Sequence, residues 1–207
     1  MIFLADASIA TLIGLLIGML IGITGHEFSH ALVADRLGDH RPRAMGRVSL
    51  NPLRHLDPLG TLLLVVVGIG WGKPVMVAPE ALRPGRVGMA MVAGAGPVAN
   101  VVMAVIVALA FRALDAAGVG GLALEALYVA VGVNLLLALL NLIPIPPLDG
   151  FAVLTALVPP QVEAALHRYA NYGFILLILL LLVPNSPLDA LLGLAFPWAR
   201  LLCGLPV

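Results

Sequence analysis

Residues 7–30 read ASIATLIGLLIGMLIGITGHEFSH. The nineteen residues 7–25 carry no charge, close to the ~20 that a helix needs to cross the hydrocarbon of a bilayer. The last five form an H-E-x-x-H element, which on a helix places His26 and His30 one turn apart, where both can bind the same Zn²⁺. Glu27 beside them can take a proton from a zinc-bound water and return it to a leaving nitrogen, which suits amide hydrolysis.

Composition indicates a membrane protein. Of the 207 residues, 61% are hydrophobic and 11% are charged, with a mean hydropathy of +1.09, whereas a soluble domain carries about 25% charged residues. Eleven basic residues balance eleven acidic ones, so the chain has no polybasic surface of the kind that attracts nucleic acid. Since Cys203 is the single cysteine, a metal site must be built from His, Asp and Glu.

Further apolar stretches predict additional membrane segments. The uncharged windows long enough for a spanning helix are 87–111, 126–148 and 169–188. Residues 58–72 are also uncharged but shorter, and they contain one proline and four glycines, which favours a re-entrant segment packed against protein. The tail, 188–205, is interpreted as a last short or interfacial helix.

Two stretches predict short strands at the membrane surface. RVSLN (47–51) and PVMVA (74–78) contain β-branched valines and are bounded by Pro, Gly or Asn. We therefore expect an all-α polytopic membrane protein with five to six transmembrane or membrane-embedded segments and a small membrane-associated β element. The whole chain, 1–207, reads as one domain, with a core over 7–158 and C-terminal helices over 162–205.

The basic residues predict the orientation. Eight of the eleven lie within 35–57 and 73–86, and the positive-inside bias places both loops on the cytoplasmic side. Both loops can lie there only if 58–72 enters and leaves by the same face. His26 then lies near the cytoplasmic end of the hydrocarbon.

Zinc held by two histidines needs a third protein ligand and an open position. Asp149 is the best candidate, because it follows an apolar window in NLIPIPPLDG (141–150), whose prolines exclude regular helix and favour a protein-supported or wet site. The alternative for Asp149 is a helix cap. Glu80, Glu125 and Glu163 remain the other carboxylates that could serve.

With these motifs the sequence resembles the site-2 protease family of intramembrane zinc metalloproteases, in its minimal bacterial or archaeal form. The resemblance rests on HEFSH (26–30), SLNPLRHLDPLGT (49–61), GKPV (72–75), AGPVAN (95–100) and NLIPIPPLDG (141–150). It implies that His26, His30 and Asp149 bind one zinc ion. It also implies that Glu27 is the catalytic acid and base and that Asn141 orients or stabilises the reacting carbonyl.

The resemblance implies hydrolysis of a peptide bond within a transmembrane helix of a protein substrate, in a prokaryotic cell membrane and close to its cytoplasmic side. The substrate helix must unwind, and a strand edge near 47–51 or 74–78 could hold its extended form. The alternative is a non-catalytic zinc-binding or zinc-transporting membrane protein, for which Glu27 would have no use as a base.

Other positions qualify this interpretation. Phe151 and Ala152 follow Gly150, where many relatives have a second glycine and a basic residue, so the local loop shape departs from the family pattern. Asn100 and Asn134 lie in apolar windows, where interhelical hydrogen bonds are the commoner use of such residues.

Overall fold

The computed structural model describes residues 7–58, 60 and 72–206. Within them the chain is helical, and no ladder of strands is present. The helical elements are α1 (Ile9–Arg36), α2 (Arg41–Ala44), η1 (Pro52–Arg54), η2 (Pro79–Ala81), α4 (Arg86–Ala116), α5 (Leu122–Asn141), α6 (Asp149–Leu157), α7 (Pro160–Tyr169), η3 (Ala170–Tyr172), α8 (Gly173–Leu182), α9 (Pro187–Leu192) and α10 (Ala195–Cys203).

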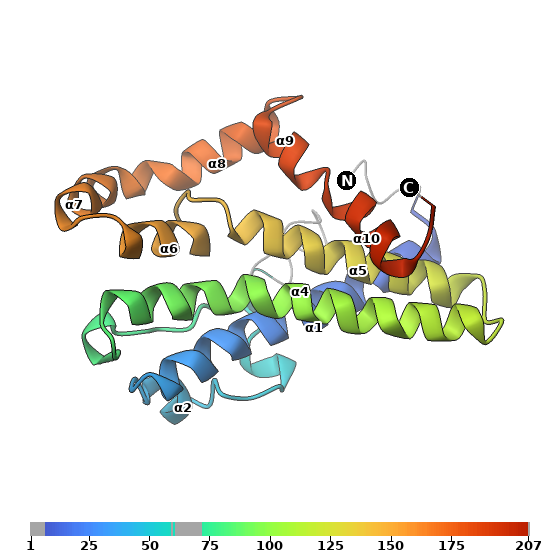
Figure 1. Cartoon of the computed structure of the whole chain (residues 1–207), viewed down its shortest axis with the longest axis horizontal. Coiled ribbons are helices and arrows are strands. Elements are labelled where there is room, and N and C mark those ends of the chain that lie inside the picture. The colour runs from blue at the N-terminus through green and yellow to red at the C-terminus, as the bar shows by residue number, and fades with distance from the viewer. Residues whose placement is uncertain (1–6, 59, 61–71, 207) are drawn as a thin grey trace.

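Helices α1, α4 and α5 form the centre of the molecule and run side by side (Figure 1). They are the three described helices long and apolar enough to cross a membrane. They contain residues 9–25 of the predicted window 7–25, all of 87–111 and most of 126–148. Helix α5 ends at Asn141, before the prolines of the last window, because a proline cannot continue a regular helix.

Small residues set the distance between α1 and α5. Gly14, Gly18 and Gly22 recur every fourth residue and therefore lie along one face of α1. A side chain at Gly14 would lie 2.5 Å from the carbonyl oxygen of Ala126, and one at Gly18 would lie 2.9 Å from Cα of Ala130. This spacing allows the close backbone approach typical of helices that associate in membranes.

The predicted span 169–188 is wrong as a single helix. Helix α8 has 10 residues, preceded by the short 3₁₀ turn η3 and ending at Leu182. Such a helix is about 15 Å long, too short to cross the ~30 Å hydrocarbon. Pro184 and Pro187 prevent the helix from continuing beyond that point. The predicted short helix in the tail is present as α10, which packs on α4 and α5.

The predicted strands are not found either. Residues 47–51 and 74–78 are irregular, and the only described bridge nearby joins Leu56 to Gly72 in antiparallel fashion. A strand needs a partner ladder. The two segments are instead connected by side-chain hydrogen bonds from Arg47 to the carbonyls of Lys73 and Pro74. Five to six membrane segments are likewise not confirmed by the described residues.

The predicted re-entrant segment 58–72 lies largely outside the described residues, but its described flanks lie at one end of the bundle. The Leu56–Gly72 bridge joins the two flanks. The amide of Arg83 donates to the carbonyl of Leu37 at 2.8 Å. The loop after α1 and the loop before α4 therefore share one end of the molecule.

This arrangement predicts the labelling of three single cysteines in a Cys203→Ser background. Met45→Cys and Arg83→Cys occupy exposed positions in the two basic loops, and Val119→Cys occupies the turn between α4 and α5 at the other end. In membrane vesicles of known orientation, an impermeant thiol reagent should label the first two from one side and Val119→Cys from the other. Labelling of Met45→Cys and Arg83→Cys from opposite sides would contradict the structure.

Candidate metal centre

Two histidines and one aspartate converge where α1, α4 and α6 meet. His26 and His30 lie one turn apart on α1 with their rings edge to face, 4.6 Å between centroids. Asp149 is the first residue of α6, delivered there by the proline-containing connection after α5. Its Oδ2 lies 3.0 Å from Nε2 of His26 and 3.3 Å from Nε2 of His30.

Helix α4 orients both imidazoles through their other nitrogen. Nδ1 of His26 lies 2.7 Å from Oδ1 of Asn100, and Nδ1 of His30 lies 2.7 Å from the carbonyl oxygen of Val92. The Asn100 amide is fixed in turn, because its Nδ2 donates to the carbonyl of Gly22 at 3.1 Å. Both partners of the histidines are therefore acceptors, so each ring donates through Nδ1 and, when neutral, presents a lone pair at Nε2.

This tautomer leaves three lone-pair atoms facing one another. They are Nε2 of His26, Nε2 of His30 and a carboxylate oxygen of Asp149, all within 4.8 Å. Oδ2 of Asp149 is buried and has no hydrogen-bond partner among the described residues. Buried lone pairs repel unless a cation lies between them. Two imidazoles and a carboxylate are a donor set for Zn²⁺ that leaves a fourth position open, so the residues present fit that ion.

Glu27 lies beside this donor set in the same cavity. The cavity has a volume of about 600 Å³, and its wall includes His26, His30, Asp149 and Glu27. Oε2 of Glu27 is buried without a hydrogen-bond partner among the described residues. A carboxylate oxygen of this kind is available to accept a proton from a molecule bound in the cavity.

Asn141 lies at the C-terminal end of α5 and contributes to the wall of the same cavity. Its amide nitrogen donates to the carbonyl of Leu137 at 3.0 Å, so in this structure the donor is directed into its own helix. The predicted role of Asn141 toward a reacting carbonyl stays a prediction, since the side chain would have to rotate to offer that donor.

The alternative third ligands lie elsewhere. Glu125 accepts hydrogen bonds from Ser8 and Thr11 near the start of α1. Glu163 pairs with Arg86 at 3.0 Å. Glu80 lies in η2 and is exposed. Among the described carboxylates, Asp149 is the one that joins the two histidines in a cluster.

Asn100 and Asn134, which the sequence assigned to helix packing, do form interhelical hydrogen bonds. Asn134 donates to the carbonyl of Gly18 at 3.2 Å, and Asn100 donates to that of Gly22. The contact from Asn100 to His26 was missed, although the motif AGPVAN (95–100) contained the signal. Hydrogen-bonded partners of metal-binding histidines fix their tautomer and orientation, so Asn100 contributes to the site as well as to the fold.

The departure from the family pattern after Gly150 leaves the turn intact. A side chain at Gly150 would overlap the carbonyls of Leu142 and Ile143. The turn therefore requires glycine at this position, and the chain has glycine there. Phe151 packs edge to face on His167 of α7, 5.4 Å between centroids, and Ala152 lines the cavity.

Replacing Asp149 by alanine should weaken zinc binding by more than about 100-fold, beyond the range for losing an outer hydrogen-bond partner. The replacement removes one of the three converging donors. Glu163→Ala is the control, because it removes a carboxylate outside the cluster. Zinc content is measured by metal analysis and zinc affinity by chelator competition. Equal zinc binding by the two variants would contradict the assignment of Asp149 as a ligand.

Gly96 and Gly94 provide a steric test within one helix. A methyl group at Gly96 would lie 2.5 Å from both Cε1 of His26 and Nε2 of His30, whereas nothing lies within 4 Å of one at Gly94. Gly96→Ala should therefore abolish stoichiometric zinc binding while Gly94→Ala binds zinc as the wild type does. Equal zinc content in the two purified variants would show that α4 does not pack against the histidines in this way.

Comparisons with known proteins agree with this geometry. The sequence model for "Peptidase family M50" matches residues 112–183, which include Asn141 and Asp149. A Bacillus subtilis (strain 168) protein, provisionally named zinc metalloprotease YwhC, is 38% identical over 176 residues, covering 82% of this chain and 80% of that protein. No solved structure matches the chain at a comparable level.

More distant relatives are longer than this chain. The provisionally named zinc metalloprotease Rip2 of Mycolicibacterium smegmatis is 34% identical over 170 residues, covering 77% of this chain and 62% of that protein. Rip2 of Mycobacterium tuberculosis (strain H37Rv) is 34% identical over 173 residues, with 77% and 63% covered. Since the YwhC match covers most of both chains at this identity, the chain belongs to peptidase family M50, the site-2 protease family that its motifs resemble.

Proposed function

We propose that this chain is a zinc-dependent intramembrane endopeptidase that hydrolyses a peptide bond within a transmembrane segment of a membrane-protein substrate. The observation that carries the proposal is the pairing of a buried, unpartnered Glu27 carboxylate with the donor set of His26, His30 and Asp149 in one cavity. A structural histidine cluster would need no free carboxylate beside it.

His26, His30 and Asp149 would hold the zinc ion, with Asn100 and Val92 fixing the two rings. A bound zinc ion supplies Lewis-acid polarisation of the scissile carbonyl and of water. Glu27 accepts a proton from the attacking water as its oxygen bonds to the carbonyl carbon. When the carbon–nitrogen bond breaks, Glu27 returns that proton to the leaving nitrogen. One amide and one water thus give one carboxylic acid and one amine.

The position of His26 along α1 supports cleavage inside the bilayer, near one of its two faces. His26 lies about 26 Å from the start of α1, close to the end of the ~30 Å hydrocarbon. Both basic loops lie at the end of the bundle toward which α1 runs from His26, and the positive-inside bias makes that end cytoplasmic. The curated relatives belong to bacteria, which supports a prokaryotic cell membrane as the location.

The substrate segment must be extended where it is cut, because a helix hides its amides in intrahelical hydrogen bonds. Residues 74–77 line the catalytic cavity without belonging to a helix or a sheet. The sequence predicted a strand edge here as the surface that holds an unwound substrate. In our proposal the irregular residues 74–77 take that place, and their main-chain groups pair with those of the substrate.

A zinc transporter is the rival function. Transporters place their ligands near the membrane midplane on discontinuous helices. Here both histidines lie on the continuous helix α1, near its end, and Glu27 is available as a base. These observations favour hydrolysis.

Glu27→Gln should lower kcat by at least about 100-fold, the lower range for loss of a general base, while zinc stays bound. The amide keeps the shape of the side chain but cannot accept the proton of water. The assay is cleavage of a single-span substrate in detergent or liposomes, with zinc content measured in parallel and Glu80→Gln as the control. Full activity of zinc-loaded Glu27→Gln would refute the assignment of the base.

A further inference from the structure

The segment 73–78 forms one side of the catalytic cavity, and its middle makes few hydrogen bonds. Residues Pro74 to Val77 line the cavity together with Glu27. At its start, a side chain at Gly72 would lie 3.4 Å from Cγ of Glu27. Among the described residues, no hydrogen bond reaches the backbone of Val75, Met76 or Val77. Hydrogen bonds therefore fix the segment at its two ends, and between them Val77 packs against the apolar cluster of Ala34, Leu82 and Val92.

Arg47 holds the first end. Its side chain is 5% exposed, and its guanidinium donates to the carbonyls of Lys73, Pro74 and Arg54, with 2.7 Å to the oxygen of Pro74. One planar group with several donors thus joins two loops that no strand ladder connects in the described part of the chain. The amide of Lys73 adds a bond of 2.6 Å to the carbonyl of His55.

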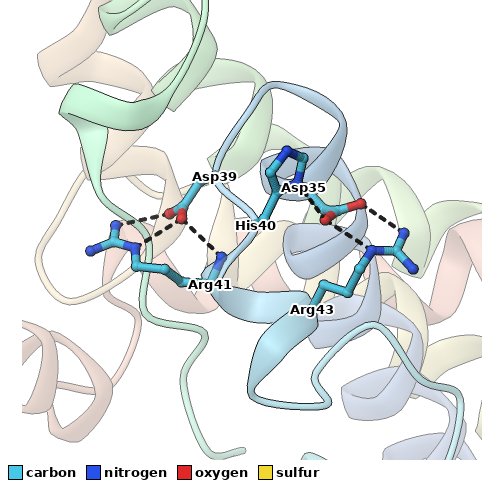
Figure 2. Close-up of polar contacts among 5 residues, drawn as sticks. All are labelled: Asp35, Asp39, His40, Arg41 and Arg43. Carbon is cyan, nitrogen blue, oxygen red and sulfur yellow. Dashed lines mark hydrogen bonds and ion pairs between the residues drawn. The ribbon is translucent and has the colours of Figure 1, made fainter.

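Asp39 holds the second end. Its carboxylate is almost fully buried and accepts a hydrogen bond of 2.8 Å from the amide of Ala78. The guanidinium of Arg41 donates two hydrogen bonds, of 2.8 and 2.9 Å, to the same carboxylate (Figure 2). These contacts hold the pKa of Asp39 below its usual range, with the bond from Arg41 as the largest cause, so the anchor stays charged. The neighbouring pair of Asp35 and Arg43 fixes the same turn (Figure 2).

Burying the Arg47 guanidinium is costly, because the described carboxylates form no ion pair with it. Burial lowers the pKa of Arg47, and the charge of Glu27 opposes that shift. The buried cation is therefore compensated by the backbone carbonyls of Arg54, Lys73 and Pro74 that accept its hydrogen bonds.

We infer that Arg47 is a positioning residue for substrate. Through its hydrogen bonds to the backbone of Lys73 and Pro74, it sets the segment 73–78 at the distance from Glu27 that an extended substrate needs. Asp39 completes the anchor at the other end. The inference rests on the proposed protease function for its substrate. It adds that, within the described residues, a buried arginine and not a strand ladder holds this wall of the cavity.

The test compares Arg47→Gln with Arg54→Gln. Both remove one positive charge from the same loop, but the Arg54 side chain is exposed and makes no described hydrogen bond. Two quantities are measured in a Cys203→Ser background: the KM and kcat for a single-span substrate, and the mobility of a spin label at Met76→Cys, a position that is 70% exposed. Zinc content is measured to establish that the metal centre is intact.

Arg47→Gln should raise KM by about tenfold or more with a smaller effect on kcat, because the surface that binds the extended substrate is displaced while Glu27 and the metal ligands remain. The label should become more mobile. Arg47→Lys, which keeps the charge but not the planar fork, should recover part of both effects. Asp39→Asn, which weakens the other anchor, should increase label mobility as well.

Equal KM values and equal label mobility in Arg47→Gln and Arg54→Gln would overturn the inference. If Arg47→Gln cannot be purified with zinc, Arg47→Lys and Asp39→Asn are compared with the wild type instead. A spin label at Met76→Cys that is as mobile in both variants as in the wild type would overturn the inference. If the wild type cleaves no substrate, the proposed function fails, but the label still decides whether Arg47 anchors the segment, because that measurement needs no substrate.

Discussion

Two imidazole rings donate their Nδ1 protons to acceptors on α4, and this direction of donation controls the rest of the site. Because Asn100 and the carbonyl of Val92 accept, both Nε2 atoms present lone pairs toward the carboxylate of Asp149. A cation between them stabilises three acceptors that converge in a buried space. The chemistry of a zinc hydrolase thus follows from which nitrogen of each histidine faces helix α4.

That orientation depends on how closely the helices pack. Gly96 allows α4 to approach the two rings, while Gly14 and Gly18 allow α5 to approach α1. In a bilayer, lipid is as apolar as the helix surfaces, so association relies on close packing and interhelical hydrogen bonds. Asn100 and Asn134 provide such bonds. One set of small and polar residues therefore stabilises the fold and holds the metal ligands in place.

The part of the cavity wall formed by residues 73–78 is built differently. No sheet is present there in the described part of the chain, and the segment 73–78 is held by a buried arginine at one end and a buried aspartate at the other. Side-chain anchors of this kind fix a segment at its ends and leave the backbone between them available. Such a surface suits a substrate that arrives as an unwound stretch of chain and binds through main-chain groups.

The sequence by itself determined the apolar helices, the ligand candidates His26, His30 and Asp149, and the candidate base Glu27, because helical periodicity and residue chemistry are local properties. It overestimated the helix over 169–188, where the 3₁₀ turn η3 precedes α8 and prolines follow it, so that α8 has 10 residues. It also predicted strands at 47–51 and 74–78 from β-branched composition. Only the tertiary structure decided that Asn100 orients His26, that Gly96 must lack a side chain and that Arg47 supports the cavity wall. Each of these depends on contacts between residues more than 25 positions apart in the chain, and local patterns carry no information about which distant atoms will meet.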